Sequence, residues 1–430
     1  MLSRHDAEVV ARDPALSGLG LLLDPDGFAA WLDEAAPDHA VRAVEPLYLR
    51  YKPGSSCVAG FRATTADGPV DLYAKAYTEA HFGIVANRAE HGARFTALAH
   101  PRLMSPDHRM VVRHAAADRE LPAVRQLAVP HRQAKFLGAL LSQPTPGMAL
   151  ETLRYKAERR FVGRVSRDRA PVALVKAYTK GDYPDALARA RRADAAGLAR
   201  MLGADERRRA VALAWLEGTP LDGLERPAFE MAVRRAGSAL AALHSGQPLT
   251  LFERDRGREV SAALKAVAAV AVLSSALGEQ AFALVRRAAG AFRGAARPAV
   301  TIHGDFSADQ VLATRSGATI LDWDALSNGE AGIDIGGFIA RLEADAAIDD
   351  AAPASTENAV SALLRGYQDR CGRLPEAIDL YAVLGMVRLA PEPFRNRQAD
   401  WPDCIAAILA RAEAILERSA WTTRRNRRTG

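Results

Sequence analysis

Residues 301–312 have the sequence TIHGDFSADQVL, in which an apolar run ends in a His-Gly-Asp triplet that contributes Asp305. A second β-type run, ATIL at 318–321, ends in Asp322. Taken singly, an acidic residue after a strand is ordinary for a loop. Two such residues behind two successive strands, with a loop of defined length between them, instead predict a functional centre built at the strand ends.

The spacing within this segment indicates its chemistry. Protein kinases place four residues between the Asp of the catalytic loop and a metal-binding Asn, and a metal-binding Asp follows in a later segment. Here four residues separate Asp305 from Gln310, and Asp322 stands at the place of the later Asp. Phosphoryl transfer uses one carboxylate to orient the acceptor hydroxyl and further groups to hold divalent metal on the phosphates. We therefore predict Asp305 as the catalytic base, and Gln310 and Asp322 as Mg²⁺ ligands.

With Gly after His, the motif resembles the aminoglycoside phosphotransferase family, the small-molecule branch of the protein-kinase-like fold. The segment that leads to Asp334 also resembles one that this family places after its metal-binding Asp. The resemblance implies a bilobal α+β fold, with an antiparallel N-lobe sheet and a mostly helical C-lobe. It further implies ATP or GTP as phosphoryl donor, Mg²⁺ as the metal and a small-molecule hydroxyl as acceptor. Supporting roles around the loop are expected for His303, Asp309, Asp324 and Asp334.

Composition narrows the class of protein. The 430 residues, 49% hydrophobic and 25% charged, fit a folded chain of about two or three packing units. We expect a cytoplasmic protein without a membrane segment, because the chain lacks both a signal-peptide core and the ~20 consecutive apolar residues of a membrane helix. Three cysteines without ligand-type spacing argue against a disulfide framework or a zinc site. The low aromatic content, 6%, argues against nucleic-acid binding.

An internal repeat is predicted in the first half of the chain. The tetrapeptide LRYK occurs at 49–52 and 153–156, and KAYT occurs at 75–78 and 176–179. Each copy has three strand-like segments, a helical segment and a further strand, which is the composition of a kinase N-lobe, and such repetition is informative about architecture. Accidental similarity between amphipathic strands is the alternative. The expected helices of the two copies span 79–99 and 183–202.

These patterns define the expected organisation. We predict an N-terminal region with a degenerate N-lobe-like repeat at 1–145 and a kinase N-lobe at 146–216. A helical C-lobe that carries the catalytic and metal-binding loops is expected at 217–420, and a basic tail at 421–430. The second copy is the expected working lobe, because it continues directly into the linker and the C-lobe.

The third strand of the second copy carries Lys176, the candidate for the kinase lysine that neutralises the α- and β-phosphates. A strand lysine whose ammonium group only reaches solvent is the alternative. Kinases hold this lysine with a Glu on the next helix, but here that helix offers only Asp194 as a weak replacement. In place of a Gly-rich turn, the second copy has Arg159 and Arg160, which are either phosphate ligands or solvated turn residues.

The linker containing Trp215 and Leu216 resembles the segment whose main chain meets the adenine in this family. Farther along, the acidic positions 343, 345, 349 and 350 lie where a cationic acceptor is held in these phosphotransferases, although such a run is more often a solvated helix face.

Two alternatives for the function stay open. Gln310 favours a sugar or sugar-alcohol kinase, because kinases of the maltokinase type resemble this chain at that position. A catalytically silent, nucleotide-binding regulator is favoured by the missing helix Glu, the absent glycines and the doubled lobe, and it is opposed by the joint presence of Asp305 and Asp322. A protein kinase is not expected, since the segment between Asp322 and Asp334 is too short for a peptide-binding activation segment.

Overall fold

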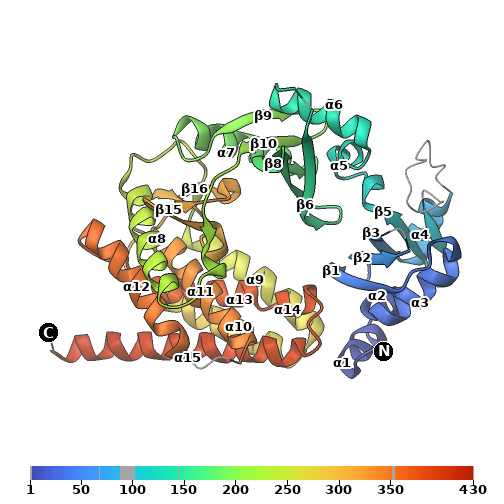
Figure 1. Cartoon of the computed structure of the whole chain (residues 1–430). Helices are drawn as coiled ribbons and strands as arrows, with labels where there is room; N and C mark the ends of the chain where they lie inside the picture. Colours follow the sequence, from blue (N-terminus) through green and yellow to red (C-terminus); the bar gives the residue numbers. More distant parts are fainter. Residues whose placement is uncertain (1, 67, 88–101, 145, 351–353, 430) are drawn as a thin grey trace. The chain divides into compact units, whose positions relative to one another are not determined.

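A computed structural model of the chain describes residues 2–66, 68–87, 102–144, 146–350 and 354–429. The chain forms two compact units, which are described separately (Figure 1). Unit 1 consists of Met1–Asp194, Arg200–Trp215 and Phe394–Ala399, and unit 2 of Ala195–Ala199, Leu216–Pro393 and Asp400–Gly430. The expected α+β class, with antiparallel sheets followed by a helical part, is confirmed.

The first sheet of unit 1 has the strand order β1-β2-β3-β5-β4, and its strand pairs are antiparallel. Its strands are β1 (Ala43–Lys52), β2 (Ser56–Thr65), β3 (Gly68–Tyr77), β4 (Leu103–Ser105) and β5 (Met110–His114). Its helices are α1 (Arg4–Ala11), α2 (Leu19–Leu23), α3 (Pro25–Ala35) and α4 (Glu79–Ala86). Phe28 of α3 stacks on Phe61 of β2 with ring centroids 4.3 Å apart, so α3 covers one face of the sheet. The rest of the helix expected at 79–99 lies largely outside the described residues.

The second sheet has the order β6-β7-β8-β10-β9, which matches the order of the first. Its strands are β6 (Met148–Lys156), β7 (Arg160–Arg167), β8 (Ala170–Tyr178), β9 (Met201–Asp205) and β10 (Ala210–Ala214). In each sheet one helix, α4 or α7 (Tyr183–Ala195), follows the third strand. This shared topology is what the predicted repeat requires, and the duplication itself stays a prediction. The helix expected at 183–202 is shorter, because Gly197 adopts a left-handed conformation (φ +69°) before β9 begins.

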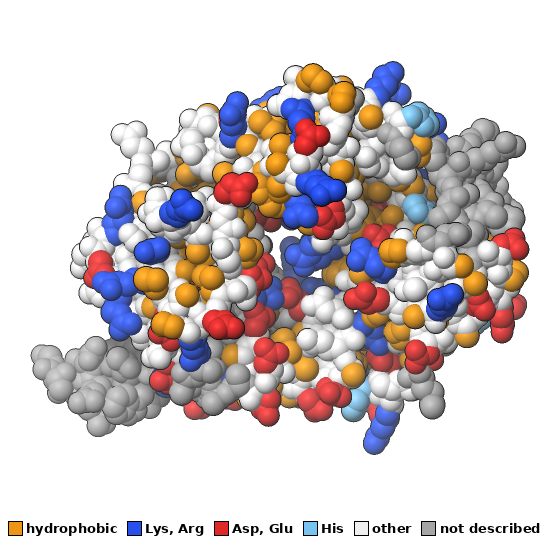
Figure 2. Space-filling model, viewed as in Figure 1, with side chains coloured by type: hydrophobic (Ala, Val, Ile, Leu, Met, Phe, Trp, Pro, Cys, Tyr) orange, Lys and Arg blue, Asp and Glu red, His pale blue; other side chains and the backbone are white. Residues whose placement is uncertain are grey.

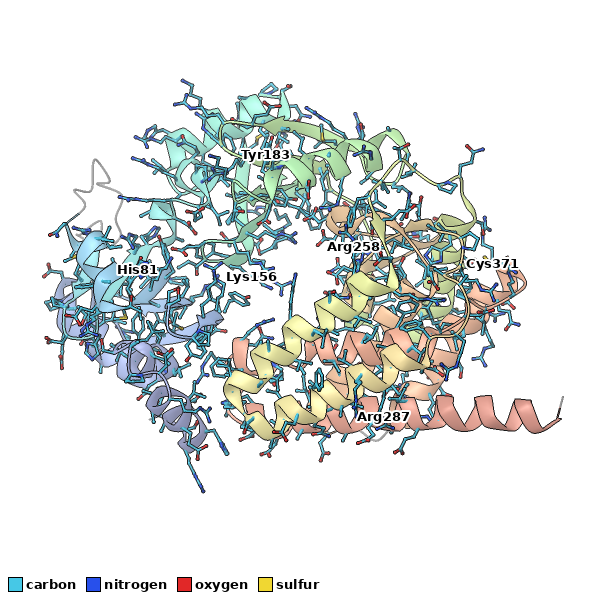
Figure 3. All side chains as sticks on the ribbon, turned by 180° about the vertical axis from the view of Figure 1, so that it is seen from behind. His81, Lys156, Tyr183, Arg258, Arg287 and Cys371 are labelled. Atoms are coloured by element: carbon cyan, nitrogen blue, oxygen red, sulfur yellow. The ribbon has the colours of Figure 1, made fainter. Side chains whose placement is uncertain are left out.

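Unit 1 has a core that is continuous between its two sheets. Helices α5 (Pro122–Leu127) and α6 (Pro130–Leu141) connect the sheets in sequence and pack on the second one (Figure 1). Val58 and Tyr73 of the first sheet belong to the same buried cluster as Tyr155 and Phe161 of the second. Lys156, labelled in Figure 3, places its ammonium 4.9 Å from the ring centre of Tyr48. The first sheet is therefore packed against the second and does not form a separate module.

Unit 2 is mostly helical. Its helices are α8 (Ala228–Ser245), α9 (Arg256–Leu273), α10 (Ser275–Ala291), α11 (Gly332–Ile348), α12 (Ala354–Cys371), α13 (Ile378–Leu389) and α15 (Trp401–Thr429), and the short α14 (Glu392–Arg395) spans a boundary between the units. Two small sheets have the orders β11-β14-β15 and β12-β16-β13. Their strands are β11 (Thr219–Pro220), β12 (Glu253–Arg254), β13 (Val300–Ile302), β14 (Val311–Thr314), β15 (Gly317–Ile320) and β16 (Ser327–Gly329).

Close helix packing positions the elements of unit 2. A Cβ at Gly366 of α12 would lie 1.8 Å from the carbonyl oxygen of Arg234 in α8, so glycine is needed where these helices touch. Arg287 of α10, labelled in Figure 3, pairs with Glu413 of α15 at 2.6 Å. Helix α15 continues through the positions that were expected to form a basic tail.

Charged side chains of both signs are interspersed with hydrophobic ones on the face of the molecule seen in Figure 2. Within the described part of the chain, the helices lack the length or the apolar content that a bilayer crossing requires.

Candidate active site in unit 2

Strand β13 leads directly into the loop that carries Asp305. The strand pairs with β16, and Ile302 at its end is fully buried. His303 is also fully buried, whereas Asp305 is exposed. The loop ends in a short 3₁₀ helix, Ala308–Gln310, from which β14 starts. The sequence therefore buries the beginning of the loop and leaves the predicted catalytic carboxylate open to solvent.

Asp334, in the first turn of α11, holds this loop from below. Its carboxylate accepts hydrogen bonds from the backbone N–H groups of His303 and Gly304, both at 2.7 Å. Nε2 of His244 lies 3.1 Å from the same carboxylate, and Nδ1 of His244 lies 3.0 Å from the hydroxyl of Tyr367. Asp334 is 1% exposed, so these contacts replace all of its hydration.

The pKa of Asp334 reflects this set of contacts. Burial acts to raise the pKa, but the hydrogen bond and coulombic attraction from His244, together with the Gly304 N–H, outweigh it and lower the pKa below its ordinary value. The carboxylate is therefore ionised at neutral pH, and its full charge is available to fix the two backbone N–H groups of the loop.

His303 joins the loop to the strand end before Asp322. Its Nε2 lies 2.6 Å from the carbonyl oxygen of Leu321, and its Nδ1 accepts from the N–H of Asp305 at 3.3 Å. The ring packs edge-on against Trp323, with centroids 5.1 Å apart. One buried imidazole thus links the backbone at Asp305 with the backbone just before Asp322.

The pairing of β14 with β15 places Gln310 beside the end of β15, where Asp322 follows. Val311 pairs with Ile320, and the N–H of Leu321 donates to the carbonyl oxygen of Gln310 at 2.8 Å. Asp322 follows directly in a left-handed conformation (φ +59°), which costs free energy for a residue other than glycine but is tolerated best by Asp and Asn. Gln310 and Asp322 therefore lie on neighbouring ends of one hairpin.

Asp309 orients the side chain of Gln310. One carboxylate oxygen accepts from the amide nitrogen of Gln310 at 3.0 Å, and the other accepts from the hydroxyl of Ser307. The amide oxygen of Gln310 consequently stays available to a metal ion. Asp324, another predicted supporting residue, lies in the 3₁₀ helix Trp323–Ala325 that follows Asp322.

These donors fit a magnesium ion. Mg²⁺ prefers oxygen ligands and is commonly held by one or two protein groups together with phosphate oxygens and water. The amide oxygen of Gln310 and the carboxylate of Asp322 are such groups. Over the described part of the chain, the side chains of His, Cys, Asp and Glu form no cluster of three that could hold a metal by itself.

A partly buried ion network centred on Glu259 also supports the loop, and sequence reasoning missed it. Arg254 donates to the carbonyl oxygen of Gly304 at 2.6 Å and pairs with Glu259, which also pairs with Arg388. Gly304 has φ +83°, and a Cβ there would lie 2.3 Å from the carbonyl oxygen of Ala325. The glycine of the triplet is thus required by its backbone conformation and by the close approach of the next loop.

The acidic positions 343, 345, 349 and 350, in α11 and just after it, are of two kinds: one is buried in the core and three are exposed. Glu343 is buried, accepts from Thr356 at 2.8 Å and pairs with Arg411 at 2.8 Å, so it belongs to the core and not to an open acceptor face. Asp345, Asp349 and Asp350 are exposed. The side chain of Asp345 is 55% exposed, but loss of the rest of its hydration, opposed by Arg341 and assisted by Glu392, Asp309 and Asp349, raises its pKa to about 6.

We expect Asp345→Asn to stabilise the protein more at pH 8 than at pH 5. Because the pKa of Asp345 is about 6 in the folded state and about 3.9 when unfolded, the folded protein binds the proton more strongly between these values. Stability from this group is thus present at low pH and lost as pH rises through 6. Thermal unfolding at both pH values measures the effect, and the exposed Asp403→Asn is the charge-matched control. An equal change at both pH values would contradict the prediction.

Predicted nucleotide-binding residues in unit 1

Lys176 lies on β8 and is 2% exposed, between Val162 of β7 and Val211 of β10 in the strand register. The interpretation of Asp194 as its partner is wrong. The carboxylate of Asp194 accepts from the N–H of Met201 at 2.9 Å, where the chain turns from α7 into β9. The aspartate side chain is short, so near the end of α7 it reaches the adjacent backbone N–H of Met201 more easily than the ammonium group of a lysine on a strand.

The turn between β6 and β7 is tight, with the N–H of Arg159 donating to the carbonyl oxygen of Lys156 at 3.0 Å. Arg159 is exposed, and Arg160 places its guanidinium 5.6 Å from the ring centre of Tyr178. Whether either arginine binds phosphate stays a prediction.

Glu158, in the same turn, has a role that the sequence did not indicate. It is left-handed (φ +55°), and its carboxylate pairs with Lys75 at 2.7 Å and with Arg50 at 3.0 Å, both on the first sheet. Asp118 accepts from the N–H of Glu158 at 2.8 Å and from the hydroxyl of Tyr155 at 2.9 Å. The first-sheet lysine that matches Lys176 in the repeat is therefore neutralised by the turn of the second sheet.

The predicted linker begins at the end of the second sheet. The N–H of Trp215 donates to the carbonyl oxygen of Val172 at 3.2 Å, and the guanidinium of Arg164 lies 5.8 Å from the Trp215 ring. Leu216 is the first residue of the next segment of unit 2. The main-chain role expected for this pair toward adenine stays a prediction.

The sequence model of the family described as "Phosphotransferase enzyme family" matches residues 149–381. None of the curated proteins matches the chain.

Three solved structures to which the chain is similar are a choline kinase, a choline/ethanolamine kinase family protein and an aminoglycoside phosphotransferase. A choline kinase from Cryptosporidium parvum Iowa II is 11% identical, with 68% of this chain and 97% of that chain covered and a TM-score of 0.50. A choline/ethanolamine kinase family protein from Mesorhizobium loti is 18% identical, with 67% and 95% covered and a TM-score of 0.47. An aminoglycoside phosphotransferase from Streptomyces rimosus is 18% identical, with 60% and 97% covered and a TM-score of 0.42.

Proposed function

The chain belongs to the phosphotransferase enzyme family, whose model spans more than half of it, and from this premise we propose that it transfers the γ-phosphoryl group of ATP to a hydroxyl of a small molecule. One observation carries the proposal. His303 and Asp334 fix an exposed Asp305 on a loop that is bonded to the hairpin end bearing Gln310 and Asp322.

Asp305 acts as the general base. Its N–H is held by His303, and among the described residues no group donates a hydrogen bond to its exposed carboxylate. The carboxylate is therefore available to accept a hydrogen bond from the acceptor hydroxyl. It takes that proton as the bond between the hydroxyl oxygen and the γ-phosphorus forms and the bond from the γ-phosphorus to the β–γ bridging oxygen breaks, with ADP as the leaving group. The carboxylate thereby orients the nucleophile and removes the charge that would develop on it.

The remaining roles follow from the donor set. Gln310 and Asp322 would hold Mg²⁺ through the amide oxygen and the carboxylate, and the metal when bound neutralises charge on the phosphates. Lys176 binds the α- and β-phosphates, with Arg159 and Arg160 as additional candidates, and the main chain at Trp215 and Leu216 binds the adenine. A sugar, an amino sugar or an aminoglycoside is the proposed acceptor, and the cytoplasm is the proposed compartment.

A panel of sugars, amino sugars and aminoglycosides with Mg-ATP tests this function. We expect ADP release above background with at least one acceptor, and loss of that turnover when EDTA removes the metal. Compounds without a hydroxyl serve as controls. If no acceptor supports turnover while nucleotide at about 100 times its Kd still raises the unfolding temperature, as a stabilisation of about 2.7 kcal/mol would, the chain is a nucleotide-binding regulator and the proposal is wrong.

A further inference from the structure

Three residues form a row across the first sheet of unit 1. Arg50 of β1 pairs with Val58 of β2, and Val58 pairs with Lys75 of β3. Residues that lie directly opposite each other on antiparallel strands project from the same face of the sheet. The two cationic side chains of this first row, Arg50 and Lys75, therefore stand on either side of the valine.

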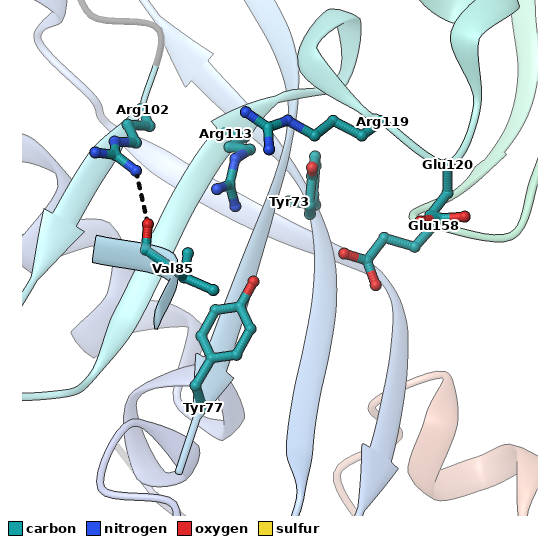
Figure 4. A pocket seen from close by; sticks show the side chains of 8 residues that line it. All are labelled: Tyr73, Tyr77, Val85, Arg102, Arg113, Arg119, Glu120 and Glu158. Carbon is teal, nitrogen blue, oxygen red and sulfur yellow. Dashed lines mark hydrogen bonds between the residues drawn. The ribbon is translucent and has the colours of Figure 1, made fainter. Parts of the chain in front are cut away.

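The first row holds an anion. The carboxylate of Glu158 lies 3.0 Å from the guanidinium of Arg50 and 2.7 Å from the ammonium of Lys75. Figure 4 shows this carboxylate extending from its turn toward the strands of the first sheet. The Glu158 side chain is only 13% exposed, so the two cations replace much of its hydration. An arginine and a lysine on either side of a valine are thus spaced to share one anionic group.

The second sheet contains a matching row. Arg154 of β6 pairs with Val162 of β7, and Val162 pairs with Lys176 of β8. Both rows cross the first three strands of sheets that have the same strand order. The second row, Arg154, Val162 and Lys176, therefore carries the same two kinds of cation at matching positions and on one face of its sheet.

No carboxylate from β6, β7 or β8, all of which the structure describes, binds Arg154 of the second row. These strands contain one acidic residue, Glu151, and it pairs with Arg164. Glu158, in the turn between β6 and β7, is held by the first row. Arg154 is exposed, and within the described part of the chain it makes no hydrogen bond or ion pair. Its guanidinium group is thus open to an anion from solution.

We propose that Arg154 binds a phosphate group of the nucleotide beside Lys176, in the place that the Glu158 carboxylate has on the first row. This inference rests on the nucleotide binding of the proposed function, and not on the transfer step or the acceptor. Arginine binds carboxylate and phosphate oxygens alike through two parallel N–H donors. Arg154 thereby supplies part of the phosphate binding that a Gly-rich loop provides in protein kinases. The first row binds a side chain of the protein, and the second binds the ligand.

Calorimetric titration of the full chain with Mg-ADP and with adenosine tests this inference. Arg154→Met removes the guanidinium from an exposed position, and we expect it to weaken Mg-ADP binding about tenfold or more, the effect of losing a charged hydrogen bond. Adenosine has no phosphate, so its affinity should stay within about twofold of the wild-type value. Arg154→Lys keeps the charge but not the parallel donors, and its Mg-ADP affinity should be intermediate. Arg207→Met, in the exposed turn between β9 and β10, is the matched control and should bind both ligands like the wild type.

The outcomes separate this inference from the proposed function. Unchanged Mg-ADP affinity in Arg154→Met would overturn the inference. Equal losses of affinity for Mg-ADP and adenosine would also overturn it, because they would show that Arg154 only supports the shape of the site. A wild type that does not bind Mg-ADP would contradict both the inference and the proposed function. A wild type that binds Mg-ADP through Arg154 but phosphorylates no acceptor would support the inference and contradict the proposed function alone.

Discussion

Asp305→Asn is expected to lower the rate of phosphoryl transfer by about 10²–10⁴-fold, the usual contribution of a general base. The amide cannot take the proton of the acceptor hydroxyl, but it has nearly the same size as the carboxylate. The N–H of Asp305 that bonds to His303 is a backbone group, and Asp334 holds the two residues before it. The loop should therefore keep its conformation, and the loss should appear in kcat with little change in nucleotide affinity.

Steady-state kinetics with the acceptor found in the panel measures this effect, and titration with ADP measures nucleotide affinity. Asp403→Asn, which makes the same change on the exposed side of α15, is the matched control and should retain full activity. Should Asp305→Asn keep activity within about tenfold of the wild type, Asp305 would not be the base, and the assignment of the loop would need to be changed.

The core of the site could be predicted from the sequence because its parts are local. Apolar runs of three or four residues, each closed by an acidic residue, specify β13 and β15 and the loops behind them. A fixed spacing from Asp305 to Gln310 specifies the start of β14, although the strand itself was not predicted. Gly304 was predicted as part of a motif, and its left-handed φ of +83° gives the physical reason for it.

The contacts that support the site could not be predicted, because they join residues far apart in the chain. Arg254 reaches the carbonyl of Gly304 across 50 positions, and Glu158 reaches Lys75 across 83. Neither contact produces a periodic pattern in the sequence, because each depends on one side chain whose direction is set by tertiary packing. The wrong pairing of Asp194 has the same origin: its choice of the Met201 N–H depends on where α7 ends, and boundaries of elements are the least predictable feature of a sequence.

Asp334→Asn is expected to destabilise unit 2 by about 3 kcal/mol or more, because it replaces a charged acceptor and leaves a buried hydrogen-bond donor without a partner. The carboxylate accepts from the N–H groups of His303 and Gly304 and meets His244, with 1% of the residue exposed. An amide of the same size has one acceptor oxygen, so its NH₂ group must oppose one of these donors in the buried site. Urea unfolding measures the loss, and Asp349→Asn at the exposed end of the same helix should change stability by less than ~1 kcal/mol.

Because of Asp334, the free energy of unfolding should also depend on pH. The folded pKa of Asp334 is lowered because the hydrogen bonds from His244 and from the Gly304 N–H outweigh the effect of burial. Its contribution to stability is therefore complete above the unfolded value of about 3.9 and is lost as pH falls through the lower folded value. The difference in unfolding free energy between wild type and Asp334→Asn should thus be constant from pH 7 to about 5 and shrink in stronger acid. A difference that grows as pH falls from 7 toward 4 would mean that burial dominates, and that Asp334 holds the loop in its protonated form.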